Sequence, residues 1–172
     1  MASLIDNIVT ILNRENEEYT VLVGLSREKT PIIIKGDLDA LNAVTEKEQE
    51  VVARIQKLER DRISTMKDIA EVTNRKQEEL KLADLIEMMN NRPAEQKKLR
   101  EVHDRLKTTM KNMVTVNDQN RVLLKNSLDM VQFEMNLLQS MRQAPETADY
   151  NKDACSTGTI MGSGTKRFDA KQ

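Results

Sequence analysis

The chain has few of the residues that build redox, metal or aromatic sites. Its 172 residues include one cysteine, one histidine, no tryptophan and only 2% aromatic residues. A single cysteine, Cys155, excludes an internal disulfide framework and a thiolate-rich metal site. His103 has no second histidine and no cysteine near it in the sequence, so we expect no zinc-type centre. The sequence therefore predicts no metal ion and no cofactor.

Long apolar runs and an excess of one charge are also missing. No run approaches the ~18 apolar residues of a membrane-spanning helix, which predicts no transmembrane segment. Acidic and basic residues are interspersed and the net charge is -1, so the chain has no basic stripe. We therefore expect no nucleic-acid binding. Residues 1–6 lack the basic segment and apolar core of a signal peptide, and we expect a cytoplasmic protein. No nucleophile–base set was found, so we predict no catalytic residues and no enzyme.

The residues that are present favour helices. Apolar side chains recur every three or four positions over residues 3–35, 38–73 and 93–142, which predicts three long helices. Pro31 interrupts the first helix near its end, and Gly36 is expected to end this helix. Asp37 is the expected N-cap of the second helix. A short helix is expected within residues 74–90, and Pro93 suits the first turn of the last helix.

These elements predict an all-α fold. Short connections favour antiparallel neighbours, so we expect an elongated antiparallel bundle or coiled coil of three long helices with one short connecting helix. We place this helical bundle domain at residues 1–143. Residues 144–172 are mostly small and polar and cannot bury enough surface to offset chain entropy. We therefore predict a disordered C-terminal tail.

Two charged residues interrupt the apolar stripe of the second long helix. Glu48 and Arg62 stand at positions that the spacing assigns to a helix seam. They are 14 residues apart on one helix and cannot touch, so each needs a partner on another helix. Structural ion pairing is favoured over catalytic carboxylates, which would need a cleft that a slender bundle does not offer.

The last long helix changes composition along its length. Over residues 95–112 only four of 18 residues are Leu, Val or Met, whereas residues 122–141 contain 11 such residues or Phe among 20. The core stripe is expected to continue through Leu124, Leu128 and Val131. A helix in a bundle needs only one buried face, so this surplus predicts a surface that a partner covers.

Asn117 and Asn120 stand on the same stripe, just before the apolar segment. Two interpretations stay open: the amides fix the register of the bundle, or they border a partner groove. Methionines in the segment suit an adaptable binding surface, although ordinary core filling remains an alternative. The candidate partner-binding residues are Asn117, Asn120, Leu123, Leu124, Leu128, Met130, Val131, Met135, Leu137, Leu138 and Met141.

Several local patterns occur in a fixed order along the chain. They are Gly36-Asp37-Leu38, Glu48 with Val51-Val52 ahead of Leu58-Glu59-Arg60-Asp61-Arg62, Asn117-Asp118-Gln119-Asn120 before Leu123-Leu124, and a polar tail containing glycine. In this order and within this length, the patterns resemble the FlgN family of flagellar export chaperones over about residues 4–150.

The resemblance implies a cytoplasmic chaperone of type III (flagellar) export. Such a protein binds the terminal amphipathic helix of hook-associated subunits, prevents their premature self-association and delivers them to an export-gate component at the membrane. Carried onto this sequence, the client-binding segment is about residues 114–143. The resemblance also implies that a tyrosine in the tail docks at the gate. Tyr150 matches that residue in location only.

A second class of function is left open. A structural coiled-coil homo-oligomer or tethering protein, with no client role, would use the wide apolar surface to pack on a copy of itself. Self-association therefore remains possible beside client binding.

Overall fold

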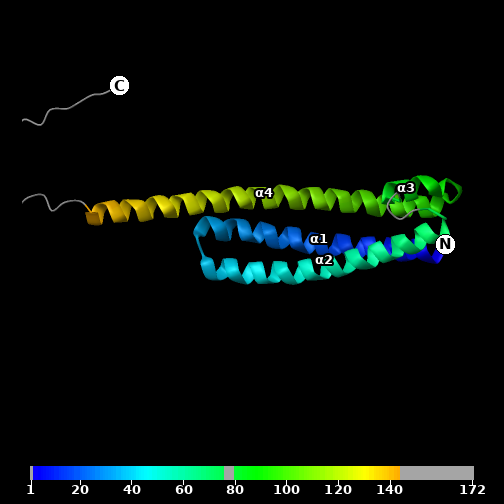
Figure 1. The fold of residues 1–172 in the computed structure, drawn as a ribbon, viewed down its shortest axis with the longest axis horizontal. Helices are drawn as coiled ribbons and strands as arrows, with labels where there is room; N and C mark the ends of the chain where they lie inside the picture. The colour runs from blue at the N-terminus through cyan, green and yellow to red at the C-terminus, as the bar shows by residue number, and fades with distance from the viewer. Residues whose placement is uncertain (1, 76–79, 144–172) are drawn as a thin grey trace, which may run out of the picture. The chain divides into compact units, whose positions relative to one another are not determined.

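The computed structural model describes residues 2–75 and 80–143, and this part of the chain is all-α (Figure 1). It contains no strand within those two ranges. The predicted fold class of three long helices with one short connecting helix is confirmed. The predicted tail, with Tyr150 and Cys155, lies outside the described residues. The elements are α1 Ala2–Lys35, α2 Leu38–Val72, α3 Leu82–Met88, the 3-10 turn η2 Met89–Asn91, and α4 Pro93–Gln143.

The chain divides into two units, Met1–Phe133 and Glu134–Gln172. The first unit contains α1, α2, α3 and most of α4, and the last turns of α4 belong to the second. The packing described below is that of the first unit. The domain boundary expected after residue 143 stays a prediction.

The turn between α1 and α2 follows the sequence closely. Gly36 has a φ of +69°, a left-handed conformation that costs glycine little, and its N–H donates to the Ile33 carbonyl at 3.1 Å. Asp37 then caps α2, because its side chain accepts from the Ala40 N–H at 3.0 Å. Pro31 lies inside α1, which continues to Lys35. These residues set α1 and α2 as antiparallel neighbours.

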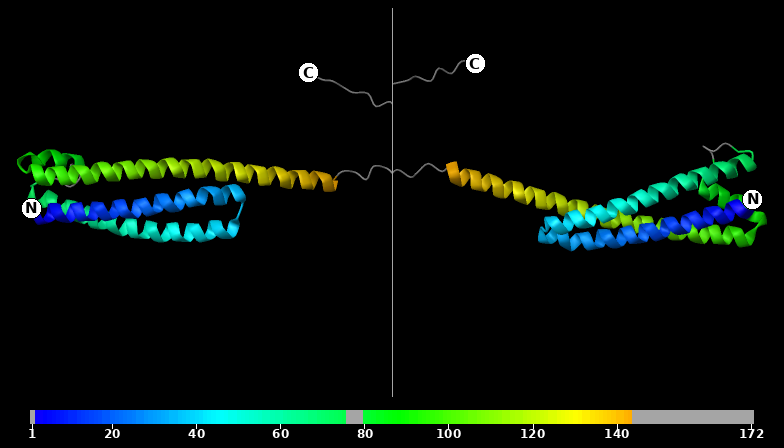
Figure 2. Two further views of the ribbon diagram at one scale, coloured as in Figure 1. Left: turned by 180° about the vertical axis from the view of Figure 1, so that it is seen from behind. Right: turned by 90° about the horizontal axis from the view of Figure 1, so that it is seen from below.

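α1 is the central long helix of the first unit. In the view of Figure 1 it is drawn between α2 and α4, and Figures 1 and 2 show that α4 runs in the same direction as α1. Within the described part of the chain, the side-chain hydrogen bonds between long helices all have α1 as one partner. The arrangement is therefore two pairs that share α1.

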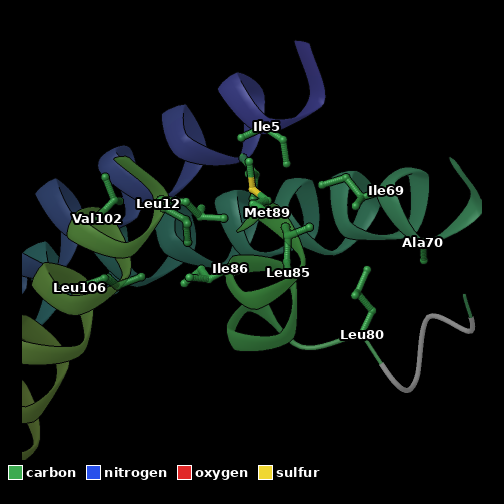
Figure 3. Packing of buried hydrophobic residues seen from close by; sticks show 12 residues of the cluster. Ile5, Leu12, Ile69, Ala70, Leu80, Leu85, Ile86, Met89, Val102 and Leu106 are labelled. Carbon is green, nitrogen blue, oxygen red and sulfur yellow. The ribbon is translucent and has the colours of Figure 1, made fainter. Parts of the chain in front are cut away.

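The short helix closes one end of the bundle. Figure 3 shows Leu85, Ile86 and Met89 of the α3–η2 segment among apolar side chains of α1, α2 and α4. Leu12 and Leu99 are fully buried in the same cluster. A second cluster, farther along the bundle, contains Leu22, Val23, Val51, Ile55 and Met113. Burial of these side chains supplies the main stabilisation of the helices.

The short helix lies within the range that the sequence predicts. Asn74 adopts a φ of 52° and its N–H donates to the Glu71 carbonyl, so α2 ends in a tight turn rather than leading into a new helix. The chain restarts at Lys81, whose N–H donates to the Asp84 carboxylate at 2.9 Å. The helix expected within residues 74–90 is found at Leu82–Met88, followed by η2.

Candidate partner-binding surface

The buried side of α4 ends near Leu124. Upstream, Leu99, Val102, Leu106, Met113 and Val116 are buried against the bundle. Every residue from 125 to 142 is exposed. The apolar side chains of this helix therefore divide into a covered group and an uncovered group.

The uncovered group coincides with the segment that composition singled out. Nine of its 11 large apolar side chains are 48–69% exposed, and Leu123 and Leu124 are partly buried. We call these 11 residues the distal surface of α4. They are Val122, Leu123, Leu124, Leu128, Met130, Val131, Phe133, Met135, Leu137, Leu138 and Met141.

The expectation that the core stripe continues past Leu124 is wrong. Leu128 is 69% exposed and Val131 is 53% exposed, although both keep the spacing of the buried residues upstream. The reason is that α1 ends at Lys35 and α2 begins at Leu38, so the first unit offers α4 no further helix to pack against. Helical spacing fixes which face a residue shares, but burial also needs a neighbour.

The distal surface is not a single stripe. At about 100° per residue, Leu128 and Met130 lie about 200° apart around the helix axis. Within the first unit, Val131 follows Leu128 at a step of three residues, and Phe133 follows Met130 at the same step. Exposed apolar side chains therefore line two sides of α4.

A buried polar cluster stands just before this surface. Asn120 is only 3% exposed, and its Nδ2 donates to the Ser26 carbonyl at 2.6 Å. Its Oδ1 accepts from Thr30 Oγ1 at 2.7 Å. Asn117, three residues earlier, is exposed and lines a surface hollow. The two asparagines therefore differ: Asn120 fixes α4 against α1, and Asn117 is accessible.

The same cluster ties α1 to α2. Glu48 accepts from Ser26 Oγ at 2.8 Å and from Lys29 Nζ at 2.7 Å. The prediction that Glu48 and Arg62 find partners on another helix is confirmed, since Arg62 pairs with Glu15 of α1 at 3.1 Å. Ser26 was not among the residues predicted from the sequence. It stands four residues after Leu22 and continues the α1 stripe, a signal that could have placed it on the seam.

Glu15 is a carboxylate inside the bundle. It is 4% exposed, and burial raises its pKa above the ordinary value of 4.5 while the neighbouring Arg62 acts in the opposite direction. Arg62 also lies 3.6 Å from Glu59 of its own helix. The arrangement stabilises helix register and needs no substrate.

Two depressions follow α4 within the first unit. A groove of about 780 Å³ lies between α2 and α4, with Leu12, Glu15 and Tyr19 of α1 in its lining and partly exposed His103 on its α4 side. A hollow of about 490 Å³ continues beside residues 117–128 of α4. Among the described residues, no group of three or more His, Cys, Asp or Glu could hold a metal ion. None of the described helices meets the length and apolarity of a membrane span.

Comparison with known proteins identifies a family. The model of a protein family described as FlgN protein matches residues 1–156, which is most of the chain. No curated protein and no solved structure matches. The family match covers α1 to α4 and therefore includes the distal surface.

Proposed function

The chain belongs to the FlgN family, which is a family of flagellar export chaperones and not of enzymes, and from this membership we propose its specific role. The protein binds the terminal amphipathic helix of hook-associated, filament-junction subunits in the cytoplasm. Binding prevents their premature self-association, and the complex is delivered to the export gate at the membrane. This mechanism needs no catalytic group.

The exposed distal surface of α4 carries the proposal. Nine large apolar side chains stand in water on a helix whose upstream half buries five of its seven. An amphipathic client helix, laid along this surface, would exclude water from both partners, which is helix-in-groove recognition. The flexible side chains of Met130, Met135 and Met141 can adapt to more than one client sequence.

The area available suits a reversible complex. Removing about 500 Å² of apolar surface per partner from water contributes about 12 kcal/mol at ~25 cal/mol/Å². Ordering of side chains and loss of translational freedom offset much of this. The remainder corresponds to affinities between micromolar and nanomolar, as a client that must later be released requires.

The two asparagines take different roles in this proposal. Asn120, bonded to α1, sets the position along α4 at which the free surface begins. Asn117, exposed beside the hollow that reaches Leu128, is the amide available to a client backbone. Client contact is thus assigned to Asn117 and the distal surface, and positioning to Asn120.

Gate docking is assigned to Tyr150, which lies outside the described residues. If this assignment holds, Tyr150→Ala abolishes binding to the purified cytoplasmic part of the export gate and leaves client affinity unchanged. Unchanged gate binding by the variant removes Tyr150 from the mechanism without touching the client-binding proposal.

The experiment uses titration calorimetry of the full chain with peptides that cover the terminal helices of the organism's hook-associated subunits. The test variant is Leu128→Asp, Met130→Asp and Leu137→Asp combined. All three side chains are exposed, so folding should survive, whereas charge on both sides of α4 should abolish binding. Circular dichroism confirms that helix content is retained.

A matched control places the same charge elsewhere. Val52 and Ile63 are exposed apolar residues on α2, so Val52→Asp with Ile63→Asp tests the general effect of new carboxylates. We expect this control to bind clients like the unaltered chain. Retained client affinity in the α4 variant, or equal loss in the α2 control, contradicts the assignment of the distal surface.

The exposed apolar area also favours a second candidate, a structural homo-oligomer or tethering protein with no client role. Sedimentation with and without client peptides separates the two. A dimer that ignores client peptides supports the structural role, and a client-bound chain supports the chaperone.

A further inference from the structure

One face of α4 lines two depressions of the first unit. The groove beside α2 is lined by Met110, Lys111 and Val114 of α4, and the next hollow by residues from Asn117 to Leu128. Met110 and Leu128 are 18 residues apart, about five helical turns, so they point to the same side of the helix. We call this side the open face of α4.

The open face carries apolar residues that the bundle leaves exposed. Met110 is 43% exposed, Val114 60% and Leu128 69%, and Val131 continues the same spacing at 53%. The neighbouring flank of α4 is occupied, because Met113, Val116 and Asn120 are buried against α1. A further helix could therefore lie along the open face beside α2 without displacing α1.

The residues of the open face are arranged symmetrically along the helix. Pairing Met110 with Val131, Val114 with Leu128, and Asn117 with Leu124 gives midpoints that all fall between positions 120 and 122. Reversing the direction of the helix thus places Met110 opposite Val131 and Val114 opposite Leu128, while the central positions pair Asn117 with Leu124 and Arg121 with its own copy. A helix with this property is complementary to its own antiparallel copy.

We propose that the occupant of the open face is α4 of a second copy of this chain, antiparallel, with a two-fold axis beside Asn120–Arg121. Each copy places its Leu128–Val131 segment against Met110 and Val114 of the other. The interface is isologous, so every contact occurs twice. All its named residues lie in the first unit.

Charges on the outer flank agree with this register. Lys111 and Asp129 are 18 residues apart, about five helical turns. Asp118 and Lys125 are seven residues apart, about two turns, so all four side chains point to one flank of the open face. In the antiparallel pair this flank of one copy contacts the same flank of the second copy. Lys111 then faces Asp129 of the second copy and Asp118 faces Lys125, which gives four ion pairs per dimer.

These four charges are available for such pairing. None of them forms an ion pair in the part of the chain that the structure describes, in contrast to Glu15, Glu48 and Arg62. Flanking charges of this kind select orientation and register more than they add affinity. The open face therefore specifies the second copy, and not merely any apolar helix.

The dimer would also affect client binding, an inference that rests on the proposed function. It covers Leu128 and Val131 and leaves Met130 and Phe133 accessible on the other side of α4. Client and second copy would then compete for the open face. The free chaperone shelters part of its client surface as a dimer and opens when a client binds.

Sedimentation of the full chain over a range of concentrations at low salt tests the dimer, with two charge variants. Variant one is Lys111→Glu with Lys125→Glu, and variant two is Asp118→Lys with Asp129→Lys. Each places like charges opposite one another in all four pairs, so we expect the dimer dissociation constant to rise about tenfold or more. An equimolar mixture restores opposite charges and should form a heterodimer as tightly as the unaltered chain.

A matched control reverses two exposed charges of α4 away from the open face, Lys98→Glu with Arg105→Glu, and should leave dimerisation unchanged. Cysteine cross-linking in a Cys155→Ser background tests direction. A mixture of Met110→Cys and Val131→Cys chains should cross-link on mild oxidation, whereas neither chain should cross-link alone. Cross-linking of one chain to itself indicates parallel pairing and overturns the proposal.

A chain that stays monomeric, or charge variants that dimerise as well as the unaltered chain, also overturns it. Client titration keeps this outcome separate from the proposed function. If the function holds, variant one binds client peptides at least as tightly as the unaltered chain, because no second copy competes. Dimerisation without client binding would leave the antiparallel pair intact and remove the chaperone role.

Discussion

The two halves of α4 behave in opposite ways. Over residues 95–112 the helix has four large apolar residues and buries three of them. Over residues 122–141 it has 11 and fully buries none. The half with less apolar surface is thus the half that belongs to the core.

This contrast separates composition from burial. Leu99 and Leu128 are the same residue type on one helix, yet the first is fully buried and the second is 69% exposed. The difference comes from the neighbours, since α1 and α3 cover Leu99, whereas Leu128 only lines a surface hollow. Apolar surface that a fold does not cover on its own is available for recognition.

The largest effect is expected from truncating the same side chain in the two halves. Leu99→Ala should lower the free energy of unfolding by about 2–5 kcal/mol, because it removes buried contacts and leaves a cavity. Leu128→Ala should change it by less than about 0.5 kcal/mol. Urea denaturation followed by circular dichroism measures both. Equal losses would mean that the distal half is packed after all.

A smaller effect is expected at the border between the halves. Asn120→Ala removes the buried amide that donates to the Ser26 carbonyl and accepts from the Thr30 hydroxyl, and should cost about 1–3 kcal/mol. Asn117→Ala, at an exposed position three residues away, serves as its control and should be nearly neutral. If both variants lose the same stability in urea denaturation, the polar cluster does not fix α4.

The smallest effect concerns the charge buried in the covered region. Because burial raises the pKa of Glu15 above 4.5, its protonated form favours the fold, and this stabilisation is lost as pH rises through the folded-state pKa. The unaltered chain should therefore lose stability relative to Glu15→Gln between about pH 4 and pH 7. Urea denaturation at both pH values measures the difference, with exposed Glu17→Gln as control. A relative gain with rising pH would mean that Arg62 outweighs burial.

The break between the first two helices could be predicted because single residues dictate it. Only a few residue types tolerate the left-handed backbone at Gly36, and Asp37 is a strong cap. Glu48 and Arg62 could likewise be assigned partners on another helix, because buried charges require them. Such local rules also placed the start of α4 at Pro93.

Tertiary context explains what the sequence did not reveal. Spacing alone continued the core stripe through Leu128, since periodicity contains no information on where the neighbouring helices end. Ser26 and Thr30 are partners of Asn120 because of the register between α1 and α4, which the sequence does not state. For the candidate surface, composition identified the segment, and the structure added which of its side chains are exposed.

The central claim, that the distal surface of α4 binds the client, is tested most directly by oxidation of methionines in dilute full-length chain. The account predicts that hydrogen peroxide oxidises exposed Met130, Met135 and Met141 much faster than buried Met113. It further predicts that a hook-associated terminal-helix peptide slows the oxidation of those three and leaves Met113 unchanged. If Met130, Met135 and Met141 react as slowly as Met113 without the peptide, or are not protected by a peptide that binds, the claim is contradicted.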